Sequence, residues 1–170
     1  MSLTASQQNK VSILTDVPLF QGLQATALES LALLFREQGF SDQQAVIEEG
    51  SPSPGLFVVT QGFVHVTRSG ENPQEAIFLT TLGAGALIGE AALFPELRRT
   101  ATIRANGNVQ TLAIRREDLL QYFADEPDAA RQILLCMLKD VFTKLQNTTF
   151  ELRTQRVAGM KQSAIDQLFS

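Results

Sequence analysis

Short apolar segments separated by turn-forming residues constrain the fold of this chain more than any other feature. The segments lie between residues 36 and 115, at 45–47, 56–59, 63–66, 76–79, 101–103 and 111–114. Residues rich in Gly, Pro, Asn and Ser separate them, at 49–52, 61–62, 69–73, 82–85 and 105–108. Short strands at this spacing are typical of closed antiparallel architectures. The pattern therefore predicts a mainly β fold, a jelly roll over residues 36–115, with a turn at each break.

The regions on both sides of the strand pattern have helical periodicity instead. Residues 1–35 form a predicted N-terminal helical segment, in which Pro18 separates one helix from the next. Residues 116–170 return to helix, with a short helix at 117–124 and a longer one that starts near Pro127. Proline suits the first turn of a helix, because the amide that it lacks has no partner there. The chain is thus predicted to be a β domain flanked by helices.

A regular seam of apolar residues marks the long C-terminal helix, predicted over residues 127–155. Its members are Leu134, Leu138, Val141, Leu145 and Leu152, with Thr148 in the same register. Steps that alternate between four and three residues are typical of a two-helix coiled coil. We therefore expect a symmetric homodimer through this helix, and the alternative is a helix packed against its own barrel.

Composition argues against several classes of function. The chain has 170 residues, a net charge of −4 and a pI near 5.0, so it lacks the basic composition of a protein that binds nucleic acid or an anionic membrane. No apolar run approaches the length of about 20 residues that a transmembrane helix needs. The single cysteine, Cys136, allows no internal disulfide and fits a reducing compartment, so we expect a cytoplasmic protein without membrane contact.

The scarcity of histidine argues against catalysis. Metal enzymes on a jelly roll need several His and carboxylate ligands that converge inside the barrel, and a catalytic nucleophile needs a base beside it. His65 is the only histidine, and a polar position on the outer face of a strand explains it better than a ligand role. We expect no metal site, no catalytic residue and no enzymatic activity.

One stretch, residues 88–102, combines residues suited to a small ligand. Its members are Ile88, Gly89, Glu90, Ala91, Ala92, Arg99, Thr100 and Ala101. Gly89 lets the backbone approach a ligand closely, and the first amides of the helical turn that starts at Glu90 favour an anion. Arg99 adds a planar cation that fits two phosphate oxygens, and Thr100 adds a hydroxyl donor. The carboxylate of Glu90 is compatible with such a ligand if the ligand also offers a donor, such as a ribose 2′-hydroxyl.

This stretch resembles the phosphate-binding cassette of cyclic-nucleotide-binding domains. The shared elements are Gly89-Glu90, the run Ala91-Ala92-Leu93, and Arg99 with a small residue and Ala101 behind it, at a spacing that the family uses. The stretch 46–66 also resembles the family, with an apolar-Glu-x-Gly turn before a strand. The resemblance covers residues 11–152 and is greatest to the sensor domain of bacterial catabolite activators (Crp/Fnr-type). It implies a bound cyclic nucleotide and a regulatory role, and the spacing favours Arg99 over Arg98 at the phosphate.

The resemblance also implies ligand contacts outside the cassette. Val66, Leu79 and Ile88 match positions that line the ribose and the base, and Thr148 and Thr149 match adjacent residues of the dimer helix that recognise adenine. Alternatively, Thr148 sets the register of the seam or bonds to its own helix carbonyl. The threonine pair favours cAMP as the ligand, whereas the hydroxyl of Thr100 would also serve the amine of a guanine in cGMP.

Two other interpretations stay open. One is a ligand-independent dimerisation module that retains the cassette as a relic. The other is the sensor part of a longer transcription regulator that binds cGMP. Catabolite activators carry a helix-turn-helix domain after the dimer helix, and residues 153–170 are too few for one, so we expect no DNA binding by this chain.

Overall fold

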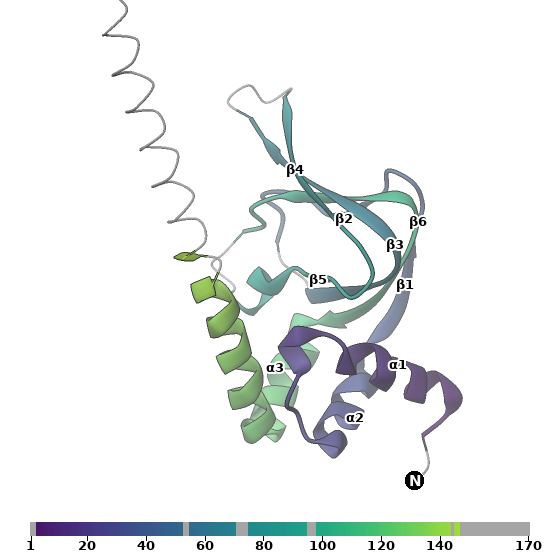
Figure 1. Cartoon of the computed structure of the whole chain (residues 1–170), viewed down its shortest axis with the longest axis vertical. Helices are drawn as coiled ribbons and strands as arrows, with labels where there is room; N and C mark the ends of the chain where they lie inside the picture. Colours follow the sequence, from purple (N-terminus) through teal and green to yellow (C-terminus); the bar gives the residue numbers. More distant parts are fainter. Residues whose placement is uncertain (1–2, 53–54, 71–74, 95–97, 144, 147–170) are drawn as a thin grey trace, which may run out of the picture.

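An antiparallel six-stranded sheet, curled into a jelly roll, forms the centre of the molecule, and helices gather at one end of it (Figure 1). The computed structural model describes residues 3–52, 55–70, 75–94, 98–143 and 145–146. The strands are β1 (Arg36–Phe40), β2 (Ala45–Ile47), β3 (Gly55–Ser69), β4 (Ala76–Leu82), β5 (Leu87–Ile88) and β6 (Thr102–Arg115). The helical elements are α1 (Ala5–Thr15), η1 (Pro18–Phe20), α2 (Ala25–Leu34), η2 (Glu90–Leu93) and α3 (Arg116–Asp125), and a last helix occupies residues 127–143 and 145–146. This mainly β fold with flanking helices confirms the predicted fold class.

Two long strands, β3 and β6, form the middle of the sheet, and both differ from the prediction. The turns expected at 61–62 and 105–108 are wrong, because each of these breaks lies inside a strand that continues through it. Gly62 has a φ of +84° and Gly107 one of +75°, and the pairing of β3 with β6 shifts its register in this region. A Cβ on Gly62 would lie 2.5 Å from the carbonyl oxygen of Asn108. These glycines therefore bend paired strands, as bulges do, and do not end them.

The strand pattern does not predict β1 and β5. The strand order is β1-β6-β3-β4, with β2 also paired to β6 and β5 to β3. Only Phe40 of β1 is buried, so this edge strand shows no apolar alternation in its sequence. The two residues of β5 pair with β3, with Ile88 opposite Phe57. Both strands depend on a partner far along the chain, which local propensity does not report.

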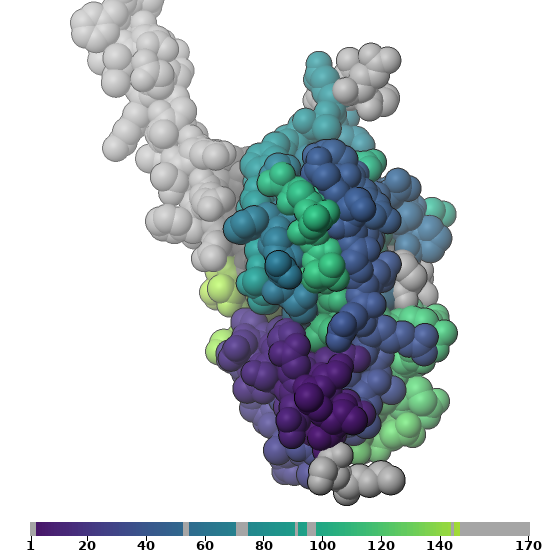
Figure 2. Space-filling view, turned by 90° about the vertical axis from the view of Figure 1, so that its right-hand side faces the viewer, coloured from purple at the N-terminus to yellow at the C-terminus, as the bar shows by residue number. Residues whose placement is uncertain are grey.

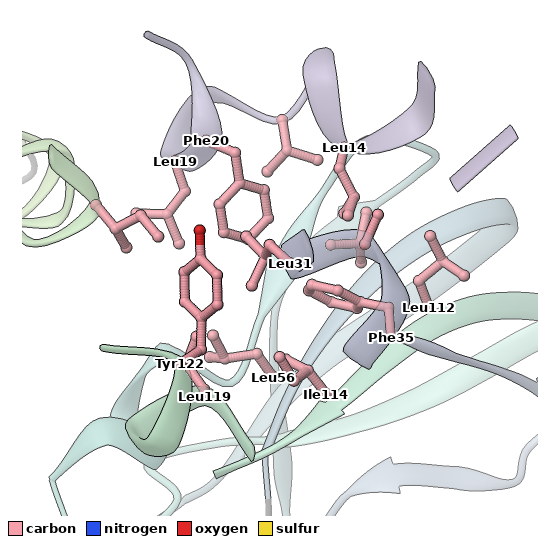
Figure 3. Close-up of a cluster of buried hydrophobic side chains, with 14 of the residues drawn as sticks. Leu14, Leu19, Phe20, Leu31, Phe35, Leu56, Leu112, Ile114, Leu119 and Tyr122 are labelled. Atoms are coloured by element: carbon pink, nitrogen blue, oxygen red, sulfur yellow. The ribbon is translucent and has the colours of Figure 1, made fainter. Parts of the chain in front are cut away.

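Two hydrophobic clusters stabilise this arrangement. The larger one joins the helices to the end of the sheet, and in it the rings of Phe20 and Phe35 meet edge to face with centroids 6.0 Å apart (Figure 3). The hydroxyl of Tyr122 in α3 donates to the carbonyl of Ala27 in α2 at 2.8 Å. In Figure 2 the N-terminal residues, in purple, close the lower end of the strand region. The second cluster fills the barrel and consists of Phe40, Ile47, Phe57, Val59, Val64, Ile88, Ile103, Ala105 and Val109.

The last helix packs on the rest of the molecule through its first turns. Ala129, Ala130 and Ile133 are buried, and Ile133 belongs to the larger cluster. Further along, the seam residues are exposed; they are Leu134, Leu138, Val141 and Leu145. The predicted seam residues Thr148 and Leu152, and the neighbouring Thr149, lie outside the described residues. The described part of the helix therefore carries an apolar stripe that its own barrel leaves exposed.

Candidate functional site

Gly89 connects β5 to η2 in a conformation that requires glycine. Its φ is +88°, in the left-handed region that side chains disfavour. A Cβ at this position would lie 2.5 Å from Nη1 of Arg99 and 2.9 Å from the carbonyl oxygen of Gly55. The amide of Ala92 donates to the carbonyl of Gly89 at 2.9 Å, so the predicted short helical turn follows directly. Backbone geometry and close packing therefore both fix glycine here.

Arg99 is a buried cation whose hydrogen bonds are incomplete. Its exposed fraction is 4%, and Nη2 donates to the carbonyl of Gly55 at 2.7 Å. Nε and Nη1 are also buried, and neither has a hydrogen-bond partner among the described residues. Burial lowers the pKa of the Arg99 guanidinium, and the negative charge of Glu90 opposes that shift. Because burying an unpaired charge is costly, donors left over in this way indicate a place for an anion.

The adjacent Arg98 is placed differently. Its side chain is exposed, and Nη1 donates to the carbonyl of Gly50 at 2.8 Å. The backbone next to it is paired with the same loop, since the amide of Gly50 donates to the carbonyl of Arg99 at 2.8 Å. Alternation along this paired segment sends one arginine outward and the next inward. Of the two cations, only Arg99 therefore reaches the interior.

A cavity of about 490 Å³ opens beside the Arg99 side chain. The other residues that line it are Ala45, Val46, Ile47, Glu48, Ser51 and Pro52. Sequence reasoning did not assign these residues of β2 and its following loop to the site. The signal that could have found them is the apolar-Glu-x-Gly turn at 47–50, which places a backbone turn next to an interior strand. Of the described cassette residues only Arg99 lines this cavity, whereas Gly89 and Glu90 do not.

The remaining predicted residues occupy several environments. Ile88 is buried in the barrel cluster, Val66 packs against that cluster, and Ala92 is buried within η2. Ala101 is half-buried, whereas Thr100 is exposed. Leu79 is 52% exposed, at a point in β4 where the register against β3 shifts. Of Ala91 only the backbone is described, and Thr148 and Thr149 lie outside the described residues.

A second cavity, of about 320 Å³, lies apart from the cassette. The loop before α2, the first turn of α2 and the start of the last helix line it, with Gly22, Ala27, Glu126 and Gln132 among the residues. It contains neither Gly89 nor Arg99. Across the described ranges, no three His, Cys, Asp or Glu side chains converge in a way that would hold a metal ion.

Fold and site together define a class of protein: a jelly-roll domain whose barrel holds a buried, incompletely paired arginine beside a glycine turn. Comparison with known proteins agrees with this class. The sequence model of the cyclic nucleotide-binding domain matches residues 37–126. The chain belongs to the cyclic nucleotide-binding domain family, as the cassette predicted.

The names of individual relatives mention two different cyclic nucleotides, cAMP and cGMP. The chain is 27% identical over 122 residues to a "CRP-like cAMP-activated global transcriptional regulator" of Mycobacterium tuberculosis, which covers 72% of this chain and 54% of the relative. It is 30% identical over 136 residues to the "cGMP-dependent protein kinase, isozyme 1" of Drosophila melanogaster, covering 78% of this chain and 16% of the kinase. The chain thus spans about half the length of the regulators it matches, and a smaller part of the kinase.

A solved structure shows the same architecture. The N-terminal domain of a transcriptional regulator from Streptomyces coelicolor superposes with a TM-score of 0.69 at 29% identity, over 78% of this chain and 94% of that domain. The family to which the chain belongs is a regulatory ligand-binding domain. In the part of the chain that the structure describes, no helix is long and apolar enough to cross a membrane.

Proposed function

We propose that this chain is a cytoplasmic cyclic-nucleotide sensor domain that acts as a dimer, prefers cAMP and performs no reaction. The cyclic phosphate binds to Arg99 and to the backbone that follows Gly89. Glu90 accepts a hydrogen bond from the ribose 2′-hydroxyl, and Val66, Leu79 and Ile88 contact the ribose and the base. Binding then biases the position of the last helix relative to the barrel.

The single observation that carries the proposal is the state of Arg99. Two of its nitrogen atoms are buried without hydrogen-bond partners among the described residues, and its terminal nitrogens lie against Gly89, where a Cβ would not fit. A guanidinium binds phosphate through charge-assisted hydrogen bonds, which are the strongest class of hydrogen bond in proteins. An anionic ligand that reaches Arg99 would bond to the donors that the protein leaves unused. Family membership supports the choice of a cyclic nucleotide as that anion.

The preference for cAMP is supported by the threonine pair and by the relatives. Thr148 and Thr149 resemble residues that recognise adenine in catabolite activators, and the mycobacterial relative is named as cAMP-activated. The alternative ligand is cGMP, which the name of the Drosophila relative and the hydroxyl of Thr100 favour. Direct competition between the two nucleotides separates these possibilities.

Dimerisation is supported by the exposed stripe on the last helix. Its described members are exposed leucine and valine side chains at coiled-coil spacing, namely Leu134, Leu138, Val141 and Leu145. Apolar side chains that recur in this way are stabilised by burial against a partner helix. A second copy of the chain presents the same stripe and therefore satisfies it.

Titration of the purified protein tests the proposal. Calorimetry with cAMP and with cGMP, and 5′-AMP as a matched non-cyclic control, gives the affinity for each ligand. A cyclic nucleotide at 100 times its dissociation constant should stabilise the folded state by about 2.7 kcal/mol, which thermal melting detects. Binding of 5′-AMP as tight as that of both cyclic nucleotides would contradict a site built for the cyclic phosphate. No stabilisation by either cyclic nucleotide would favour the relic dimerisation module instead.

A further inference from the structure

A glutamate outside the cassette connects three parts of the proposed site. Oε2 of Glu49 accepts hydrogen bonds from the backbone amide of Ser69 at 2.8 Å and from its hydroxyl at 3.0 Å. Ser69 is the last residue of β3, where the hairpin to β4 begins. The amide of Glu49 donates to Oγ1 of Thr102, the first residue of β6, at 3.0 Å. One residue thus bonds to the end of β3 and the start of β6, which also pair directly with each other, Thr67 opposite Thr102.

The residues after Glu49 connect the same loop to the cassette. The amide of Gly50 donates to the carbonyl of Arg99 at 2.8 Å, and the amide of Arg99 to the carbonyl of Ser51 at 3.4 Å. The side chain of Arg98 adds a bond to the carbonyl of Gly50 at 2.8 Å. The loop also lines the cavity beside Arg99, through Glu48, Ser51 and Pro52. It is therefore the wall of the cavity and, at the same time, a link between the cassette and the base of the hairpin.

We propose that Glu49 is a positioning residue for ligand binding, which fixes the β3–β4 hairpin at a set distance from Arg99. This inference rests on the proposed function. The hairpin carries Val66 and Leu79, which are expected at the ribose and the base, whereas Arg99 is expected at the phosphate. A ligand that bridges these groups binds well only if their spacing is held before it arrives, because ordering them on binding costs free energy. Glu49 does this without contacting the ligand.

The hydrogen-bond geometry indicates which substitutions separate positioning from stability. A carboxylate accepts both bonds from Ser69 with one oxygen and strengthens them by its charge. Glu49→Gln keeps an acceptor oxygen at the same reach, whereas Glu49→Ala removes it. Glu75, an exposed residue directly before β4 in the same hairpin, provides a matched control as Glu75→Ala. Ser69→Ala removes the hydroxyl of the pair and leaves its amide.

The test measures nucleotide affinity and thermal stability of each variant in the full chain, at a temperature well below the melting transition. We expect Glu49→Ala to weaken cAMP or cGMP binding by about tenfold, the size of effect that one lost charge-assisted hydrogen bond produces. Glu49→Gln should recover most of the affinity, Glu75→Ala should bind as the wild type does, and amide exchange at Ser69 should be faster in Glu49→Ala. In the double variant Glu49→Ala/Ser69→Ala, the loss of nucleotide affinity should be smaller than the sum of the two single losses, because both substitutions remove the same hydrogen bond between the Ser69 hydroxyl and Glu49.

Several outcomes would overturn the inference. Equal affinity of the wild type and Glu49→Ala, with a lowered melting temperature, would make Glu49 a structural residue only. The same loss in Glu75→Ala would show a general effect of hairpin charge. If the wild type binds neither nucleotide, the proposed function fails and this inference fails with it; if the wild type binds and Glu49→Ala binds equally well, only this inference fails.

Discussion

The guanidinium of Arg99 occupies the space that a side chain on Gly89 would need. A Cβ built on Gly89 lies 2.5 Å from Nη1 and 3.0 Å from Nη2 of that arginine, far inside van der Waals contact. The two residues lie ten positions apart in the chain and are brought together because β5 pairs with β3 and the segment after η2 pairs with the loop at residues 50–51. The glycine and the arginine therefore act as one unit, because the guanidinium fits in its observed position only if residue 89 has no side chain.

Gly89→Ala tests this unit. The substitution places a side chain in a left-handed conformation, which costs about 1 kcal/mol or more, and it also displaces the Arg99 guanidinium. Gly85→Ala is a matched control, since Gly85 has a φ of +86° but nothing within 4 Å of a Cβ. We expect both variants to melt at lower temperature and only Gly89→Ala to lose nucleotide affinity, by about tenfold or more (about 1.4 kcal/mol). Equal affinities of the two variants by calorimetry would contradict the expectation.

Arg99→Met separates the contribution of the arginine to binding from its contribution to stability. Because the guanidinium is buried with two nitrogens that have no hydrogen-bond partner among the described residues, an apolar side chain of similar length should leave the free energy of unfolding unchanged or raise it. The same substitution should weaken binding at least about tenfold, since it removes the phosphate ligand. Arg98→Met keeps the buried cation and should lose less affinity. If Arg99→Met melted at a much lower temperature and still bound the nucleotide normally, Arg99 would contribute to stability and not to binding, which is the reverse of this prediction.

Tyr122 should make the stability of the fold decrease as the pH rises into the alkaline range. Burial raises the pKa of the Tyr122 hydroxyl, and a hydrogen bond involving Ser30 partly opposes the shift. An acid whose pKa is higher in the folded than in the unfolded state stabilises the fold below its unfolded pKa of about 10, and this contribution is lost as the pH rises through the folded value. Tyr122 is the only tyrosine and there is no tryptophan, so phenolate absorbance follows this group directly.

The matched variant for this prediction is Tyr122→Phe. It loses the hydrogen bond to the Ala27 carbonyl, which contributes about 1 kcal/mol, and it should no longer show the alkaline decrease attributed to Tyr122. Denaturant unfolding at pH 7 and again above pH 10 measures both effects. A tyrosine that ionises at the pH of a free phenol in the folded protein would show that the hydroxyl is not held as described.

Leu138→Glu should convert a dimer to a monomer. The side chain of Leu138 is 52% exposed on the apolar stripe of the last helix, and a charge at a seam position is strongly unfavourable in a coiled coil. Leu33→Glu is the control, because Leu33 on α2 has the same exposed fraction of 52% on another surface. Sedimentation should give a halved mass for Leu138→Glu alone. Dissociation by both variants, or by neither, would argue against the stripe as the interface.

Thr148→Val tests the recognition of the base. If Thr148 contacts adenine, as the resemblance to catabolite activators implies, removal of its hydroxyl should weaken cAMP binding by roughly fivefold to tenfold and affect cGMP less. Valine has the same shape, so packing in the seam is preserved. Competition of the two nucleotides against one fluorescent analogue measures the ratio directly. Equal losses for both nucleotides would count against adenine recognition by this residue.

Local features of the sequence predicted most of the fold. Turn residues and short apolar runs indicated a jelly roll, and helical periodicity placed helices on both sides of it, because these signals lie within a few residues of one another. The same locality caused the errors at Gly62 and Gly107. A glycine with positive φ ends one strand and bends another, and the difference depends on whether the facing strand continues. That partner is about 45 positions away (from Gly62 to Gly107), beyond the reach of a local pattern.

The sequence by itself determined the family, since Gly89, Glu90 and Arg99 lie within one short stretch, ten positions from first to last. Only the tertiary structure decided that Arg99 is directed inward and Arg98 outward, and that β2 and the following loop form the wall of the cavity. Burial and pairing are properties of segments that meet in space. Whether a cation is buried without a partner or exposed to solvent depends on the segments packed around it, and those come from distant parts of the chain.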